Sequence, residues 1–236
     1  TKIMTALVAL GEGDLDRVYT VKPEYAAVEG SSMYLQAGER LSLRDTLYGL
    51  MLASGNDAAV AIAGECGGMN AFVGKMNAKA AELGLTDTHF DNPNGLPSDT
   101  HYTTAHELAK ITAAALKDPV FRQIVSTKSC TVSGHALSNH NRLLSMYDGA
   151  IGVKTGFTRA AGRCLVSAAE RNGRTIIAVT LNDPNDWNDH REMLDAGFAQ
   201  YSEVTLHTAG DTIANVRVFG GEVVAEGKVI LPVDIG

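Results

Sequence analysis

The sequence is poor in the residues and patterns that mark metal sites and disulfide scaffolds. It has three cysteines, Cys66, Cys130 and Cys164, and no C-x-x-C pair, so neither a zinc knuckle nor a redox pair is predicted. Its seven histidines form no H-x-x-x-H or H-E-x-x-H pattern, which argues against a zinc hydrolase. We therefore expect no metal and no cofactor, and we interpret the cysteines as small buried thiols.

Positive charge and long apolar runs are also scarce. The chain has 20 Lys+Arg against 27 Asp+Glu, a net charge of −7 at pH 7, and no basic stripe of the kind that binds nucleic acid. No run approaches the roughly 18 apolar residues that a membrane span requires. Residues 1–10 are apolar but lack the basic leader of a signal peptide. We expect no nucleic-acid partner. Any export signal or membrane anchor is expected outside residues 1–236.

What is present is enough apolar sequence for a large folded domain. The 236 residues are 45% hydrophobic, which excludes a disordered chain. Helical patterns come first, a β pattern follows Val125, and one helix returns near the end, so the fold class is α+β, with an antiparallel sheet flanked by helices. We predict a catalytic-size domain over residues 1–202 and the beginning of a β-rich domain, cut short, over residues 203–236.

Capping signals and periodicity locate the elements. They predict helices over residues 1–10, from Ser42, over Asp57–Glu65, from Asn70 to just before Gly84, and from Thr104 through Leu116. Strands are predicted at 130–132, 150–155, 163–169 and 175–181, with a hairpin turn at Asn172-Gly173. The last helix is expected from about His190 to Tyr201, and a further hairpin around Gly220-Gly221.

Three short motifs, far apart in the sequence, carry the chemistry. Thr1-Lys2 opens the first helix, Ser54-Gly55-Asn56 lies at a helix break, and Lys154-Thr155-Gly156 ends a strand. Each tripeptide is weak evidence by itself. In this order, each on the expected type of element, they resemble the S-x-x-K, S-D-N and K-T-G set of penicillin-binding proteins and class A β-lactamases, with two departures: the serine of the first motif would precede Thr1, and Gly55 stands in place of the Asp.

The chain resembles the low-molecular-mass D-alanyl-D-alanine carboxypeptidases of that superfamily. The resemblance covers nearly the whole sequence, through EGSSMYL, LMLASGNDAAVA, THFDNPNGL, HYTTAHELA, NRLL and GVKTGFTRAAGRCL. It implies a β-lactamase/transpeptidase-like fold with a mainly helical subdomain. S-G-N in place of S-D-N favours the carboxypeptidase branch over class A β-lactamase.

The resemblance implies a role for each catalytic candidate. The S-x-x-K spacing places the nucleophilic serine two residues before Thr1, on the same helix face as Lys2. Lys2 would be its base, provided that burial, the helix N-terminus and a second cation lower its pKa. Ser54 would relay the proton to the leaving amine, Asn56 would bind substrate or hold Lys2, and Lys154 would supply positive charge and bond to Ser54.

Substrate binding is expected at the end of the K-T-G strand. By resemblance, the Thr155 hydroxyl binds the terminal carboxylate of the substrate, Gly156 is a further substrate-binding position, and the Phe157 N–H belongs to the oxyanion hole. Arg191, which we expect at the start of the last helix, matches the arginine that the family uses for the same carboxylate, because a guanidinium pairs with a carboxylate through two bonds.

The expected activity is removal of the terminal D-Ala from peptidoglycan stem peptides ending in D-Ala-D-Ala, with β-lactams as covalent inhibitors. Such an enzyme would work outside the cytoplasmic membrane, either secreted or held peripherally by a C-terminal anchor. Two alternatives stay open: a β-lactamase, although the E-x-x-L-N motif of class A enzymes does not occur, and a catalytically inactive wall-binding homologue.

Overall fold

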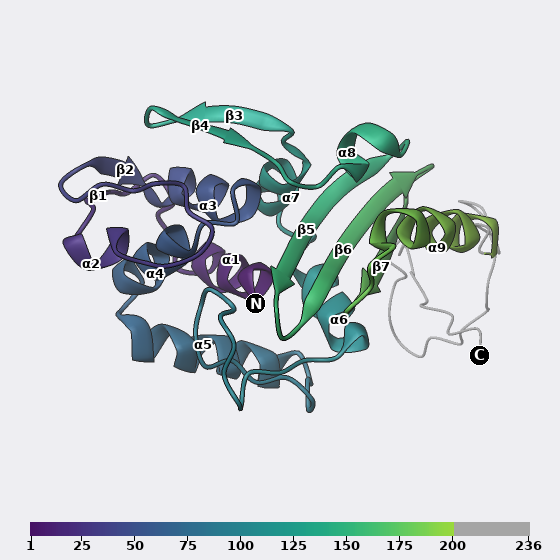
Figure 1. The fold of residues 1–236 in the computed structure, drawn as a ribbon, viewed down its shortest axis with the longest axis horizontal. Helices are drawn as coiled ribbons and strands as arrows, with labels where there is room; N and C mark the ends of the chain where they lie inside the picture. Colours follow the sequence, from purple (N-terminus) through teal and green to yellow (C-terminus); the bar gives the residue numbers. More distant parts are fainter. Residues whose placement is uncertain (201–236) are drawn as a thin grey trace, which may run out of the picture. The chain divides into compact units, whose positions relative to one another are not determined.

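The computed structural model describes residues 1–200, which form nine helices and three small sheets (Figure 1). The predicted β-rich domain over residues 203–236, with its hairpin at Gly220-Gly221, lies outside the described residues. The helices are α1 Lys2–Leu10, α2 Pro23–Ala26, α3 Leu43–Leu52, α4 Asn56–Glu65, α5 Met69–Glu82, α6 Ala105–Ala115, α7 Pro119–Ser126, α8 Leu143–Met146 and α9 Asp186–Gln200. The strands are β1 Val18–Thr20, β2 Arg40–Ser42, β3 Ser129–Val132, β4 His135–Ser138, β5 Ala150–Thr158, β6 Gly162–Arg171 and β7 Arg174–Thr180.

Helix α1 is the centre of the helical part. It contacts α3, α4, α5, α6 and α7. Six of its nine residues are buried, including Thr5, because side chains on every face of the helix meet a neighbour. Leu7 and Leu10, by contrast, are only partly buried at the margin of the core. Figure 1 shows the first residues of α1 facing β5.

The main sheet is antiparallel with strand order β5-β6-β7. Its residues alternate between two faces: Val166 and Ala168 belong to the helical core, whereas Leu165 and Ala169 pack with Leu194 of α9. Helices α6 and α7 contact the sheet from the helical part, and α9 packs on β6 and β7. Among the described strands β5 is an edge, and it carries the K-T-G motif next to α1.

Most start and stop signals act as the sequence predicts. Ser42 and Thr104 each accept a hydrogen bond from the backbone N–H three residues later, and Gly84 takes a left-handed conformation after α5, with φ +67°. Asn172 and Gly173 also have positive φ, 52° and 76°, in the hairpin turn between β6 and β7. These elements are confirmed.

Two helix starts differ from the prediction, and α7 is among the elements that the sequence analysis did not predict. Helix α5 begins at Met69 after Gly68, so Asn70 is not its cap. Helix α7 was not predicted, although Asp118 caps it and Pro119 occupies its first turn. Helix α9 begins at Asp186, four residues before the predicted start. The turn at Asn185 leads directly into the helix, because the Asn185 carbonyl accepts hydrogen bonds from the N–H groups of Asn188 and Asp189.

The cysteines are free thiols, and they differ in burial. Cys66 is buried at the end of α4, whereas Cys130 of β3 and Cys164 of β6 are only partly buried. The interpretation as buried thiols is therefore confirmed for Cys66 and is wrong for the other two, which lie on strands with one side near solvent. Within residues 1–200 no helix is long and apolar enough to cross a membrane.

Candidate active site

Lys2 lies in the first turn of α1, and two acceptors hold its amine. Its Nζ donates to Asn56 Oδ1 at 2.7 Å and to the carbonyl oxygen of Asn94 at 2.6 Å. Burial lowers the pKa of Lys2 to about 8, against the opposing effect of the Asp57 carboxylate. A neutral amine is therefore accessible near physiological pH, which is the condition for a lysine to act as a base.

The S-G-N motif occupies the break between α3 and α4. Ser54 has a φ of 58°, a conformation that non-glycine residues rarely adopt and that marks functional sites. Gly55 then passes so close to a neighbouring loop that an added Cβ would lie 3.2 Å from the Met33 nitrogen. The break turns Asn56 toward α1, where its Oδ1 accepts from Lys2 and its Nδ2 donates to the Glu29 carbonyl at 2.8 Å.

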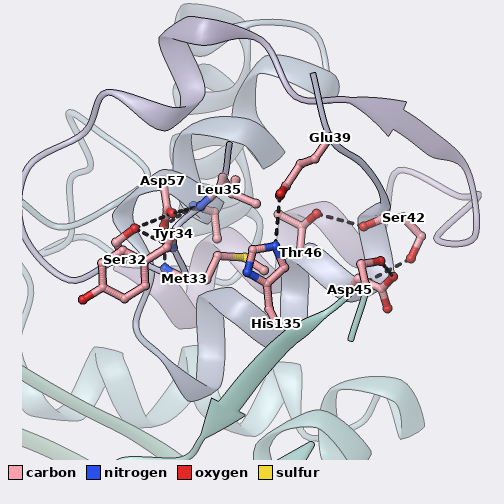
Figure 2. A network of polar contacts seen from close by, with 12 residues as sticks. Ser32, Met33, Tyr34, Leu35, Glu39, Ser42, Asp45, Thr46, Asp57 and His135 are labelled. Atoms are coloured by element: carbon pink, nitrogen blue, oxygen red, sulfur yellow. Dashed lines mark hydrogen bonds and ion pairs between the residues drawn. The ribbon is translucent and has the colours of Figure 1, made fainter. Parts of the chain in front are cut away.

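Asp57 fastens the loop of residues 29–35 to the start of α4 (Figure 2). The side chain is 1% exposed, and its two oxygens accept four hydrogen bonds, from the Ser32 hydroxyl and from the backbone N–H groups of Met33, Leu35 and Ala58. The same loop supplies the Ser31 carbonyl that accepts from Asn56 N at 2.7 Å. Asp57 thus positions Asn56, and through it Lys2, without touching the amine.

A second loop, residues 91–101, closes over the other side of α1. Besides the Asn94 carbonyl that holds Lys2, its Pro93 carbonyl accepts from the Thr5 hydroxyl at 2.7 Å. His101 Nδ1 accepts from the Asp91 N–H, so Nε2 carries the proton and donates to the Thr1 hydroxyl at 2.6 Å. Burial lowers the pKa of His101, which keeps the imidazole neutral. His101 therefore borders the site.

Lys154 brings the second amine from β5. The residue is 8% exposed, and burial, together with the positive charge of Lys2, lowers its pKa to about 7. The two amines therefore share one site, as the motif order predicts. Lys154 Nζ donates to the Thr155 carbonyl at 2.7 Å. The expected bond from Lys154 to Ser54 is not among the hydrogen bonds of the described residues.

The remaining K-T-G positions open toward solvent. Thr155 is partly buried, Gly156 is exposed, and the Phe157 side chain is 71% exposed. In the register of the sheet these residues pair with Leu165, Cys164 and Arg163 of β6. Among the described residues, no strand lies along their outer edge.

Arg191 lies farther along α9 than the sequence suggested. Because the helix begins at Asp186, Arg191 occupies its second turn and is exposed. Its neighbour His190 is fully buried and bonds Ser167 and Thr180 of the sheet, at 2.6 and 3.0 Å. No polar contact of the Arg191 side chain is found among the described residues.

Sequence reasoning missed the groups that hold the site together. The carbonyls of Glu29 and Asn94 act through the backbone, so no residue type reveals them. Asp57 did carry a signal, since it is a lone acid at the start of an alanine-rich helix. In the part of the chain that the structure describes, no group of three His, Cys, Asp or Glu side chains could hold a metal ion.

Two amines with lowered pKa, a strained serine and a carboxamide, arranged between a helical part and the edge of an antiparallel sheet, define a serine hydrolase of the penicillin-binding class. The chain belongs to the D-alanyl-D-alanine carboxypeptidase family, whose model matches residues 1–185. The resemblance read from the motifs is thereby confirmed.

Individual relatives agree with this assignment. The chain is 39% identical to a D-alanyl-D-alanine carboxypeptidase of Streptomyces sp. strain K15, over 84% of this chain and 77% of the relative. It is 38% identical to the carboxypeptidase DacF of Bacillus subtilis, over 94% of this chain but only 61% of DacF.

Solved structures show the same fold. A mutant of the Streptomyces K15 DD-transpeptidase matches with a TM-score of 0.80 at 39% identity, covering 84% of this chain and 86% of the other. A penicillin-binding protein homologue from Mycobacterium tuberculosis matches with a TM-score of 0.80 at 37% identity, covering 87% and 82%. The expected β-lactamase/transpeptidase-like α+β fold is therefore confirmed.

Proposed function

We propose that the protein removes the terminal D-alanine from peptidoglycan stem peptides that end in D-Ala-D-Ala, through an acyl-serine intermediate that β-lactams also form. The observation that supports this most directly is the pair Lys2 and Lys154, two buried amines with pKa values of about 8 and about 7. In this proposal the nucleophile is a serine two residues before Thr1 in the full-length protein.

The groups divide the reaction between them. Neutral Lys2 takes the proton of the serine hydroxyl, and the serine oxygen bonds to the carbonyl carbon of the penultimate D-Ala. The Phe157 N–H stabilises the resulting oxyanion. Ser54 donates its hydroxyl proton to the leaving nitrogen as the C–N bond breaks and D-Ala departs, and it receives in return the proton that Lys2 took from the serine, so that Lys2 is neutral again. Water then attacks the acyl ester and restores the serine.

The same steps explain covalent inhibition. In a β-lactam the scissile C–N bond is part of a ring, so the leaving amine stays attached and blocks the approach of water. Lys154 attracts the carboxylate that both ligands carry, and Thr155 donates a hydrogen bond to it. Asn56 holds Lys2 in place for both reactions.

The location of the substrate sets the location of the enzyme. Stem peptides lie in the cell wall, so the active site works outside the cytoplasm. We propose that the protein is secreted or held at the outer face of the cytoplasmic membrane by a peripheral C-terminal anchor.

The test uses the full-length protein with labelled penicillin and with a peptide ending in D-Ala-D-Ala. We expect one label per molecule and release of D-Ala. Lys154→Ala should slow acylation at least about 100-fold, because both positive charge and electrostatic stabilisation are lost. The matched control is Lys117→Ala, since Lys117 is an exposed lysine in the loop after α6.

Three results would contradict the proposal. Steady turnover of a chromogenic cephalosporin would identify a β-lactamase. Absence of label in folded, full-length protein would identify an inactive wall-binding homologue. Acylation of Lys154→Ala at the wild-type rate would remove Lys154 from the mechanism.

A further inference from the structure

An arginine of the neighbouring strand faces the open end of the K-T-G strand. Arg163 of β6 pairs with Phe157 of β5, and Leu165 pairs with Thr155. Because side chains directly opposite in an antiparallel pair share a face, Thr155, Phe157 and Arg163 lie on the same side of the sheet. Arg163 and Thr155 are diagonal neighbours there, a separation that a long side chain spans.

The guanidinium of Arg163 is held on one side and open on the other. Its Nε and Nη2 donate to both oxygens of Asp186, at 2.7 to 3.1 Å. The Asp186 side chain is 4% exposed and that of Arg163 is 44% exposed. The Trp187 ring lies alongside, 5.8 Å from the guanidinium carbon to the ring centroid. Nη1 has no hydrogen-bond partner among the described residues.

Arg191 has none of these features. It is exposed on the second turn of α9, and no described group fixes its guanidinium. A flexible arginine loses more conformational entropy on binding than one already oriented by a buried carboxylate.

We propose that Arg163, together with the Thr155 hydroxyl, binds the terminal carboxylate of the substrate in place of Arg191. The inference rests on the proposed carboxypeptidase function. Asp186 is the positioning residue: it binds Nε and Nη2, which leaves Nη1 for the ligand, and it neutralises part of the charge. The buried Lys154 supplies the remaining positive charge at the same strand. Specificity for a free C-terminus then comes from geometry more than from net charge.

The experiment compares two peptides in the full-length enzyme, one ending in D-Ala-D-Ala and the same peptide with a C-terminal amide. Arg163→Gln should lower the preference in kcat/KM for the free acid by about 10- to 100-fold, the range for a lost charged hydrogen bond. Turnover of the amide should change little. Arg163→Lys keeps the charge but loses the two-pronged geometry of the guanidinium. Its preference for the free acid should therefore lie between those of the wild type and Arg163→Gln.

Arg122→Gln is the matched control. Arg122 forms an ion pair with Glu170, also on β6 but at the opposite end of the strand, and both side chains are about as exposed as that of Arg163. This variant removes a brace of the same kind away from the site, so the preference for the free acid should not change.

The outcomes separate the explanations. If Arg163→Gln and Arg163→Lys lower kcat/KM equally for the acid and the amide, then Arg163 only holds α9 to the sheet, and the proposal is overturned. A selective loss of the acid in Arg191→Gln alone would also overturn it. If wild-type protein releases no D-Ala and takes no label, the proposed function itself fails.

Discussion

At the scale of single residues, two lysines near one another are kept from both being charged. Burial is the main cause for each, and the charge of Lys2 adds to the effect on Lys154. Because the amines interact, they titrate as a pair rather than as separate groups. The form that holds one proton contains both a base and a positive charge. Because Lys154 has the lower pKa, that proton rests mainly on Lys2 in the free protein. In the proposed mechanism the substrate carboxylate beside Lys154 favours its protonated form, which leaves Lys2 as the base.

This pairing predicts a peaked pH dependence of acylation. Below about pH 7 both amines are protonated and no base is available, and above about pH 8 both are neutral and the attraction for the carboxylate is lost. We expect the second-order rate of labelling by penicillin to be highest between these values. A rate that stays constant across this range would contradict the assignment of both lysines.

The sequence predicts a site residue correctly where the interaction is made by its side chain. Lys2, Asn56 and Lys154 are brought together as the motifs indicate. The contacts that hold them come from backbone carbonyls, and any residue type supplies a carbonyl. Arg163 was also missed, because only the strand register shows that it lies opposite Phe157.

At the scale of elements, the loop of residues 29–35 acts as a clamp on the helix break. Gly30 sits where an added Cβ would lie 2.6 Å from the Asn56 amide nitrogen, and its φ is +91°. Gly38 has almost the same φ, +90°, but an added Cβ there would meet nothing within 4 Å. Alanine variants at the two positions therefore share the backbone strain, whereas only the variant at Gly30 also crowds the active site.

We predict that Gly30→Ala and Gly38→Ala each lose about 1–2 kcal/mol of stability from the left-handed backbone, and that Gly30→Ala loses more in total because its Cβ also crowds Asn56. Only Gly30→Ala should also slow acylation, because it displaces Asn56 from Lys2. Thermal unfolding and the labelling rate measure the two effects. Equal labelling rates in the two variants would show that Asn56 is not held by this loop.

Element boundaries were harder to predict than element types. The hairpin at Asn172-Gly173 and the Ser42 and Thr104 caps depend on local chemistry, so the sequence is sufficient for them. Helix α7 is short and follows closely on α6, and its burial of Phe121 against the core is a tertiary contact. The start signal of α7, Asp118 followed by Pro119, is local, but a helix of eight residues depends on such a tertiary contact for its stability.

At the scale of the whole molecule, the active site is built at a cost to stability. A buried lysine whose pKa falls from 10.5 to about 7 is charged more easily in the unfolded chain. Between these two pH values the unfolded state binds more protons, so this group makes stability rise with pH. Below about pH 7 Lys154 is charged in both states, so the folded protein carries the full free-energy cost of the buried charge.

Lys154→Met, which keeps the approximate size of the side chain, should therefore raise the Tm most in mildly acid solution. Each gain of about 1 kcal/mol is worth about 2–4 °C in a domain of this size. The advantage should shrink as the pH approaches 10.5, the ordinary lysine value. Lys117→Met, at an exposed site, is the control, and a Tm difference independent of pH would argue against the buried charge.

The two amines also couple ligand capture to the solvent. An anion that settles beside Lys2 and Lys154 favours their protonated forms, so its arrival draws a proton from the buffer, and by reciprocity a more acid medium tightens the encounter complex. The bond-making step instead requires one amine to be bare. Acidification therefore strengthens binding of the ligand but slows the chemical step. The pH of the surroundings thus sets the lifetime of the encounter complex that an antibiotic or a peptide forms before it reacts.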